Sequence, residues 1–165
     1  MDNNINALLH VLNEELKIYN ELLSLSRNKT DIIIKGKVTE LDTMVKREQE
    51  LIVELGGLES QREAAVDKIA QQLNINPSEI TMSELVNRLE PVQAQELRKY
   101  QLNLTGILGE LKELNDTNSK LIKNSLEFIN FSINIMAGAP DTGNNYGGNG
   151  QVHDPGKRNL FDMKL

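Results

Sequence analysis

Residues 5–25 read INALLHVLNEELKIYNELLSL, and the spacing of their apolar residues decides the fold class. Apolar side chains recur at steps of three and four, which is the spacing of one face of an α-helix. The predicted stripe consists of Ile5, Leu8, Leu9, Leu12, Leu16, Tyr19, Leu22 and Leu23, and weakens through Ser26 and Thr30 to Ile33 and Ile34. Asp and Asn at positions 2–4 are good caps, and Gly36 is a natural stop. The sequence therefore begins with a long amphipathic helix.

A second long helix follows at once. Thr39, with Asp42 three residues later, predicts a capping box at its start. Its stripe consists of Leu41, Val45, Glu48, Ile52, Leu55, Leu58, Arg62, Val66, Ile69 and Leu73. Gly56 and Gly57 lie midway, each costing about 1 kcal/mol relative to alanine. Because the stripe stays in phase across them, we expect a kink or a close approach rather than a break.

Three polar residues interrupt the apolar stripes, two on the second helix and one on the last helix, which is described below. Glu48 and Arg62 are separated by about 21 Å of helix rise, so they cannot pair with each other. We expect them to pair across an antiparallel hairpin or to line a partly wet seam. Asn118, on the stripe of the last helix, is interpreted as a polar residue that sets the register of packing.

The segment NINPSEITMSELVNRLEP, residues 74–91, connects the hairpin to a final helix. Asn76-Pro77 with Glu79, and Thr81 with Glu84, are helix-start signals, so we expect a turn and then a short helix that ends near Pro91. The final helix is predicted from about Val92 to Ala137, with Leu97, Tyr100, Leu104, Ile107, Leu108, Leu111, Leu114, Asn118, Leu121, Ile122 and Leu126 on one face. Gly138 caps it and Pro140 prevents its continuation. The predicted fold is all-α, an elongated antiparallel helical bundle.

The end of this final helix is apolar on several sides. The residues concerned are Leu126, Phe128, Ile129, Phe131, Ile133, Ile135 and Met136. A helix of this kind needs cover on more than one side. Either the short helix or the C-terminal tail covers it, or it is an open surface for a partner. Contiguous exposed apolar residues usually indicate such a binding surface.

The chain ends in a Gly- and Asn-rich tail, so the sequence predicts a bundle domain at 1–137 and a flexible tail at 138–165. Ordering such a tail costs about 1–2 kcal/mol per residue in backbone entropy, more than its few apolar side chains return. Its tip is apolar nevertheless. We expect Tyr146, Leu160, Phe161, Met163 and Leu165 to join the binding surface, unless the tip docks on its own bundle.

Composition argues against several function classes. With no cysteine there is neither a disulfide nor a thiolate site, and a net charge of −6 without a basic stripe disfavours nucleic acid. The N-terminus carries no signal-peptide pattern, and no stretch is long and apolar enough for stable membrane insertion, so we expect a cytoplasmic protein. His10 is interpreted as a surface residue and His153 lies in the tail. No cofactor, metal site or catalytic group is predicted, and we expect no enzyme activity.

The chain resembles the FlgN family of flagellar type III export chaperones. The resemblance is carried by IIIKGKVTELDTMVKREQELIVEL, LKELNDTNSKLIKNSLEFI and YGGNGQVHDPGKRNLFDMKL, and it spans nearly the whole chain. Within these segments the matching residues are Leu41, Glu48, Gln49, Asn118, Leu121, Ile122, Tyr146, Gly147, Gly150, Leu160, Asp162 and Lys164. Gly56 and Gly57 are not part of the pattern.

The resemblance implies a non-enzymatic cytoplasmic chaperone. Such a protein binds hook–filament junction proteins before export and delivers them to the export gate or export ATPase of the flagellar apparatus. The alternative from the sequence is a structural coiled-coil adaptor that homo-oligomerises through its apolar C-terminal helix.

Overall fold

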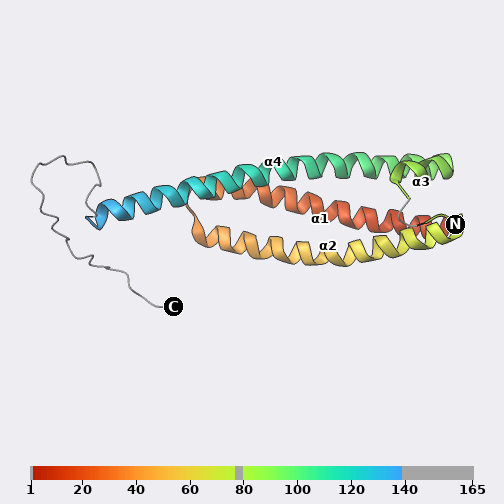
Figure 1. Ribbon diagram of the computed structural model, residues 1–165, viewed down its shortest axis with the longest axis horizontal. Coiled ribbons are helices and arrows are strands. Elements are labelled where there is room, and N and C mark those ends of the chain that lie inside the picture. The colour runs from red at the N-terminus through yellow and green to blue at the C-terminus, as the bar shows by residue number, and fades with distance from the viewer. Residues whose placement is uncertain (1, 77–79, 139–165) are drawn as a thin grey trace, which may run out of the picture. The chain divides into compact units, whose positions relative to one another are not determined.

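The computed structural model describes residues 2–76 and 80–138, and within these ranges the chain forms four helices and no strand (Figure 1). The helices are α1 (Asp2–Ile34), α2 (Val38–Leu73), α3 (Met82–Arg88) and α4 (Pro91–Met136). The predicted all-α class is therefore confirmed, as are the long hairpin, the short connecting helix and the long last helix. The signal at Asn76-Pro77 with Glu79 lies largely outside the described residues.

The chain divides into two compact units, Met1–Ile122 and Lys123–Leu165. The first unit is a helical bundle of α1, α2, α3 and α4 up to Ile122. Helices of 33 and 36 residues are each about 50 Å long, which makes this unit elongated. A boundary between a 1–137 domain and a 138–165 tail stays a prediction, because residues 139–165 lie outside the described part of the chain.

The turn between α1 and α2 depends on Gly36, whose φ of +65° lies in the left-handed region. Lys37 N donates to Ile32 O at 3.1 Å, and Gly36 N donates to Ile33 O at 3.1 Å. These two bonds close the end of α1 in the way a glycine C-cap does. The predicted stop at Gly36 is confirmed.

The predicted capping box at Thr39 is wrong. α2 begins at Val38 with Lys37 as its N-cap, and no side chain caps it. Thr39 is already helical, and its carbonyl accepts a hydrogen bond from Thr43 Oγ1 at 3.1 Å. The physical reason is the compactness of the glycine turn, which returns the chain to helical geometry within one residue.

The interior of the first unit contains two clusters of buried apolar side chains. One joins Ile5, Leu8, Leu9 and Leu12 of α1 to Ala65 and Ile69 of α2, Leu85 and Val86 of α3, and Leu97 of α4. The other joins Leu22 and Leu23 of α1 to Leu51 of α2 and Leu111 of α4. α1, α2 and α4 contribute to both clusters, and α1 supplies the largest share of the side chains in each.

Most of the predicted α1 stripe is buried, but the α2 stripe is shifted at its centre. Leu51 is 1% exposed, whereas Ile52, the predicted core residue, is 59% exposed. Val45 and Leu108, also predicted as core, are exposed as well. Ile34 at the end of α1 is exposed because the chain turns away two residues later.

The polar residues of the stripes pair across the hairpin, as predicted. Lys29 Nζ of α1 donates to Glu48 Oε2 of α2 at 2.6 Å, and both side chains are largely buried. Arg62 Nε of α2 donates to Glu15 Oε1 of α1 at 3.1 Å. Glu15 is itself buried, a position that the predicted stripe omitted.

Asn118 is buried between α4 and α1, in agreement with its predicted place in the seam. Its Nδ2 donates to the Ser26 carbonyl at 3.0 Å, and its Oδ1 accepts from Thr30 Oγ1 at 2.7 Å. One side chain thus satisfies a backbone and a side-chain group of α1 at the same level of the bundle.

α2 continues without interruption through Gly56 and Gly57. A Cβ atom added at either glycine would meet nothing within 4 Å. The expected close approach at these glycines is therefore wrong, because both lie on the exposed side of α2.

α3 begins where Thr81 and Glu84 predict it. Thr81 Oγ1 accepts a hydrogen bond from Glu84 N at 3.2 Å, which caps the helix. Leu85 and Val86 then insert into the first apolar cluster. This short helix closes one end of the bundle.

Candidate protein-binding surface

The candidate surface is the last part of α4, which lies in the second unit. We name it the α4 apolar end, and it consists of Leu126, Phe128, Ile129, Phe131, Ile133, Ile135 and Met136. Their exposed fractions lie between 47% and 87%. Consecutive positions on a helix point about 100° apart, so these exposed side chains face several sides of α4. Their role as a binding surface for a partner stays a prediction.

The sequence predicts two alternative covers for this end, α3 and the tail. Leu85 and Val86 of α3 are buried within the first unit, in the cluster that contains Ile5 and Leu97. The other alternative, docking of the tail, concerns Tyr146, Leu160, Phe161, Met163 and Leu165. These five residues lie outside the described part of the chain, and their membership of the surface stays a prediction.

The helical backbone of the α4 apolar end is held to its last residue. Ala137 N donates to Ile133 O at 2.8 Å, and Gly138 N donates to Ile135 O at 3.1 Å. Gly138 has a φ of +61°, so the predicted glycine stop is confirmed. Ser132 Oγ donates to the Phe128 carbonyl at 2.9 Å, which keeps a polar group of this segment bonded to its own helix.

The α4 apolar end has little charge. From Phe128 to Gly138 the sequence contains no Asp, Glu, Lys or Arg. Glu127, between Leu126 and Phe128, forms an exposed pair with Lys123 one turn earlier, with Nζ and Oε1 4.0 Å apart. A partner of this surface is therefore recognised by apolar contact and shape, and ionic attraction has little part in it.

Aromatic anchors are concentrated here. The chain has three phenylalanines, and Phe128 and Phe131 lie one turn apart in the α4 apolar end, 70% and 61% exposed. The third, Phe161, belongs to the predicted tail tip. Large aromatic side chains often carry most of the binding energy at protein interfaces, so these two are the natural anchors.

Titratable groups with shifted pKa values lie on α1 and α2. A hydrogen bond from Lys17 lowers the pKa of Glu14, and bonds to Asp42 and to Glu50 raise the pKa values of Lys46 and Arg47 respectively. Burial, followed by the nearby Glu15 carboxylate, raises the pKa of the Tyr19 phenol. Ordinary surface pairing and burial account for all four shifts.

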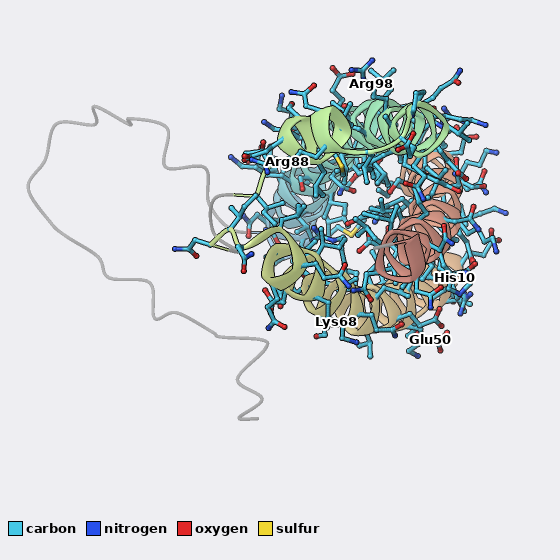
Figure 2. All side chains as sticks on the ribbon, turned by 90° about the vertical axis from the view of Figure 1, so that its right-hand side faces the viewer. His10, Glu50, Lys68, Arg88 and Arg98 are labelled. Atoms are coloured by element: carbon cyan, nitrogen blue, oxygen red, sulfur yellow. The ribbon has the colours of Figure 1, made fainter. Side chains whose placement is uncertain are left out.

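The side chains labelled in Figure 2, His10, Glu50, Lys68, Arg88 and Arg98, lie on the outside of the first unit. His10 is exposed, in agreement with its interpretation as a surface residue. Within residues 2–76 and 80–138, no three His, Asp or Glu side chains are grouped so as to hold a metal ion. In the same ranges, no helix combines the length and apolarity needed to cross a bilayer.

Comparison with known sequences identifies the family. The profile described as FlgN protein matches residues 1–154, which is nearly the whole chain and includes the α4 apolar end. The chain belongs to the FlgN family. FlgN proteins are flagellar export chaperones that bind export clients, so a partner-binding surface is expected in this family member.

A Bacillus subtilis (strain 168) protein matches this chain over nearly the whole length of both. It is the uncharacterized protein YvyG, 27% identical over 161 residues, and the match covers 96% of this chain and 97% of YvyG. No solved structure matches this chain significantly.

Proposed function

We propose that this FlgN family member is a cytoplasmic chaperone that binds hook–filament junction proteins before their export. In this proposal the α4 apolar end covers a terminal amphipathic segment of the unassembled subunit, by packing of helix against helix. The tail tip, with Tyr146, Leu160, Phe161, Met163 and Leu165, adds to the same surface. The chaperone then delivers the subunit to an export gate or export ATPase component. No enzyme activity is proposed.

One observation carries the proposal. Seven apolar side chains at the end of α4, two of them phenylalanines, are between 47% and 87% exposed, and no charged residue follows Glu127 in this segment. Exposed apolar surface of this extent on a single helix is costly in water unless a partner covers it. A subunit awaiting export has the matching need, because its own assembly surface must be covered until it leaves.

Titration calorimetry with a purified junction subunit tests the proposal. We expect Phe128→Ser with Phe131→Ser to weaken binding at least about tenfold, since truncated aromatic anchors commonly cost more than 1 kcal/mol each. The matched control is Val92→Ser with Leu102→Ser, which removes two exposed apolar residues from another part of α4. Equal losses in both double variants would show that the effect is not specific to the α4 apolar end.

Deletion of Gly138–Leu165 tests the tail separately. We expect weaker binding, with part of the affinity kept by the α4 apolar end. Unchanged affinity after this deletion would remove the tail from the binding surface and leave the rest of the proposal in place.

The same exposed residues favour a second candidate function, a structural adaptor that homo-oligomerises through the α4 apolar end. Sedimentation of the protein alone separates the two. A stable dimer that becomes a monomer when Phe128 and Phe131 are replaced by serine, and that binds no junction subunit, would favour the adaptor.

A further inference from the structure

A second apolar surface lies in the first unit, between α2 and α4. Within the described residues of this unit, side-chain hydrogen bonds and ion pairs connect α1 to both of these helices. They join α1 to α2 through Lys29–Glu48, Glu21–Arg47 and Glu15–Arg62, and α1 to α4 through Ser26–Asn115, Arg27–Glu110, Thr30–Asn118, Asn118–Ser26 and Asn13–Tyr100. These bonds hold both α2 and α4 against α1. A groove lies between α2 and α4.

The groove consists of two adjoining hollows of about 660 Å³ and about 230 Å³, which share Tyr19, Leu55 and Leu108. α1 forms its floor, and the walls are formed by α2 and α4. Along α4 it runs from Leu104 to Asp116, which is about 18 Å of helix rise. A groove of this length matches about three turns of a docked helix.

The walls of the groove have apolar side chains with no partner. Ile52 of α2 is 59% exposed and Leu108 of α4 is 46% exposed, although both fall on the predicted stripes. Leu55 and Leu111 lie deeper, against the second apolar cluster. Three helices arranged around such a trough lack the fourth helix that would complete a four-helix bundle.

The occupant that fits these walls is a helix. Both walls are helices, whose backbone N–H and C=O groups are already bonded within themselves. An extended or looped segment lying there would leave its own backbone groups without partners, whereas a helix satisfies them internally. An amphipathic helix with apolar residues at spacings of three, four and seven would set them between Ile52 and Leu108.

The charged residues that line the groove indicate which kind of helix fits it. Glu48 is neutralised by Lys29 at one end of the groove, and Glu15 by Arg62 at the other. Arg62 also bonds to Glu59, which lines the same hollow, at 3.4 Å. Lys112 and Asp116, of opposite sign and one turn apart, line the other hollow. The groove therefore favours a helix whose buried face is uncharged, and it offers no attraction to a strongly acidic or basic segment.

The length of the groove favours a helix of the client over the apolar tip of this chain's own tail. The apolar tip from Leu160 to Leu165 has six residues, less than two helical turns, and would fill about half of an 18 Å groove. We infer that the α2–α4 groove binds a three-turn amphipathic helix of the export client, as a second contact in addition to the α4 apolar end. This inference rests on the proposed function and names the class of client segment.

Affinity measurements with a purified hook–filament junction subunit test the inference. Ile52→Glu with Leu108→Glu places two carboxylates in the groove and leaves Leu55 and Leu111 of the core intact. We expect binding to weaken at least about tenfold, because the docked apolar face would lose its contacts and bury charge. The control is Val53→Glu, on the neighbouring position of α2, which is 76% exposed and outside the groove. It should leave the affinity unchanged.

Cross-linking locates the contact without depending on those carboxylate variants. The chain contains no cysteine, so Leu108→Cys and Val53→Cys each give a single attachment point for a photo-cross-linker. We expect position 108 to capture a helical peptide of the junction subunit and position 53 to capture none. Equal capture at both positions, or capture from position 108 of a second copy of this chain or of its own residues 139–165, would overturn the inference.

The outcomes also separate the inference from the proposed function. If Phe128→Ser with Phe131→Ser abolishes binding while the groove variants bind normally and position 108 captures nothing, the proposed function stands and the inference fails. If the unaltered protein binds no junction subunit, both fail. Loss of binding in both sets of variants, with Val53→Glu unaffected, supports both.

Discussion

Asn118 contributes more to the register of the bundle than any apolar residue near it. It is 2% exposed, and its amide bonds both the Ser26 carbonyl and the Thr30 hydroxyl. Leucines can slide by one turn along an apolar seam at small cost, but these bonds exist at one alignment of α4 against α1 alone. A buried polar residue of this kind gives up some stability for a unique packing.

Replacement of this residue tests its role. Asn118→Ala removes two hydrogen bonds between α4 and α1 at a buried position, one to the Ser26 carbonyl and one from the Thr30 hydroxyl, so we expect the free energy of unfolding to fall by about 1–3 kcal/mol. The Thr30 hydroxyl and the Ser26 carbonyl keep their own bond of 3.3 Å. Asn115→Ala is the control, because Asn115 is exposed and its contact with Ser26 Oγ is long, at 3.5 Å. Urea unfolding measures both, and equal losses would contradict the assignment.

At this scale the sequence predicts polar seam residues better than individual apolar ones. Glu48, Arg62 and Asn118 stand out because each interrupts an apolar stripe, and all three pair with α1. The predicted stripe omits Glu15, which lies three residues after Leu12 and four before Tyr19, because hydrophobicity favours the neighbouring Leu16. Leu51 and Ile52 are equally apolar neighbours, and only the rotation of α2 against α1 decides which is buried.

At the scale of the element, glycine has two opposite roles in this chain. Gly36 is required by its left-handed backbone at the turn between α1 and α2. Gly56 and Gly57 lie inside α2 with ordinary helical backbone and open space around them. In the first case glycine permits a conformation that other residues resist, and in the second it weakens a helix that other residues would strengthen.

Alanine substitution should therefore change stability in opposite directions. We expect Gly56→Ala and Gly57→Ala each to raise the free energy of unfolding by about 0.5–1 kcal/mol, from helix propensity alone. Gly36→Ala should lower it by about 1 kcal/mol or more, since alanine is strained at a φ of +65°. Chemical denaturation of the three variants decides, and a loss at Gly56 would reveal a contact that the open space around it does not suggest.

Helix existence and helix ends were predictable where local chemistry fixes them. Gly36, Gly138 and the Thr81–Glu84 cap all lie where the sequence indicates. The start of α2 was not, because the Thr39–Asp42 pattern competes with a glycine turn that returns the chain to helix earlier. A cap motif is informative when the preceding segment is extended, as it is before α3, where Thr81 has extended φ and ψ.

For the whole molecule, the buried core and the most exposed apolar segment of the described residues fall in different units. Both apolar clusters and the buried polar pairs described above belong to Met1–Ile122. The second unit contributes an exposed helical segment in its described part. The sequence indicates this division, because the apolar residues of α4 lie on one face up to Ile122 and on several faces from Leu126 onward. It does not indicate whether another part of the chain packs over that last segment, because such packing depends on the tertiary structure.

Truncation after Ile122 tests this separation. We expect a chain of residues 1–122 to remain folded, with a thermal midpoint within about 5 °C of the full chain, because no cluster loses a member. Hydrogen exchange on the full chain should show strong protection around Leu97 and Leu111 and weak protection from Lys123 to Met136, since an unpacked helix opens locally at small cost. Unfolding of the truncated chain would place part of the core in the second unit.

The absence of charge from Phe128 to Gly138 has a consequence for how much of this protein a cell can hold. Copies meeting through that segment experience no electrostatic repulsion there, so an excess over the available subunits would tend to coalesce and precipitate. We therefore expect high-level expression of the chain alone to give inclusion bodies, and co-expression with its client to restore a dispersed product. Synthesis of the two would then have to be matched in amount.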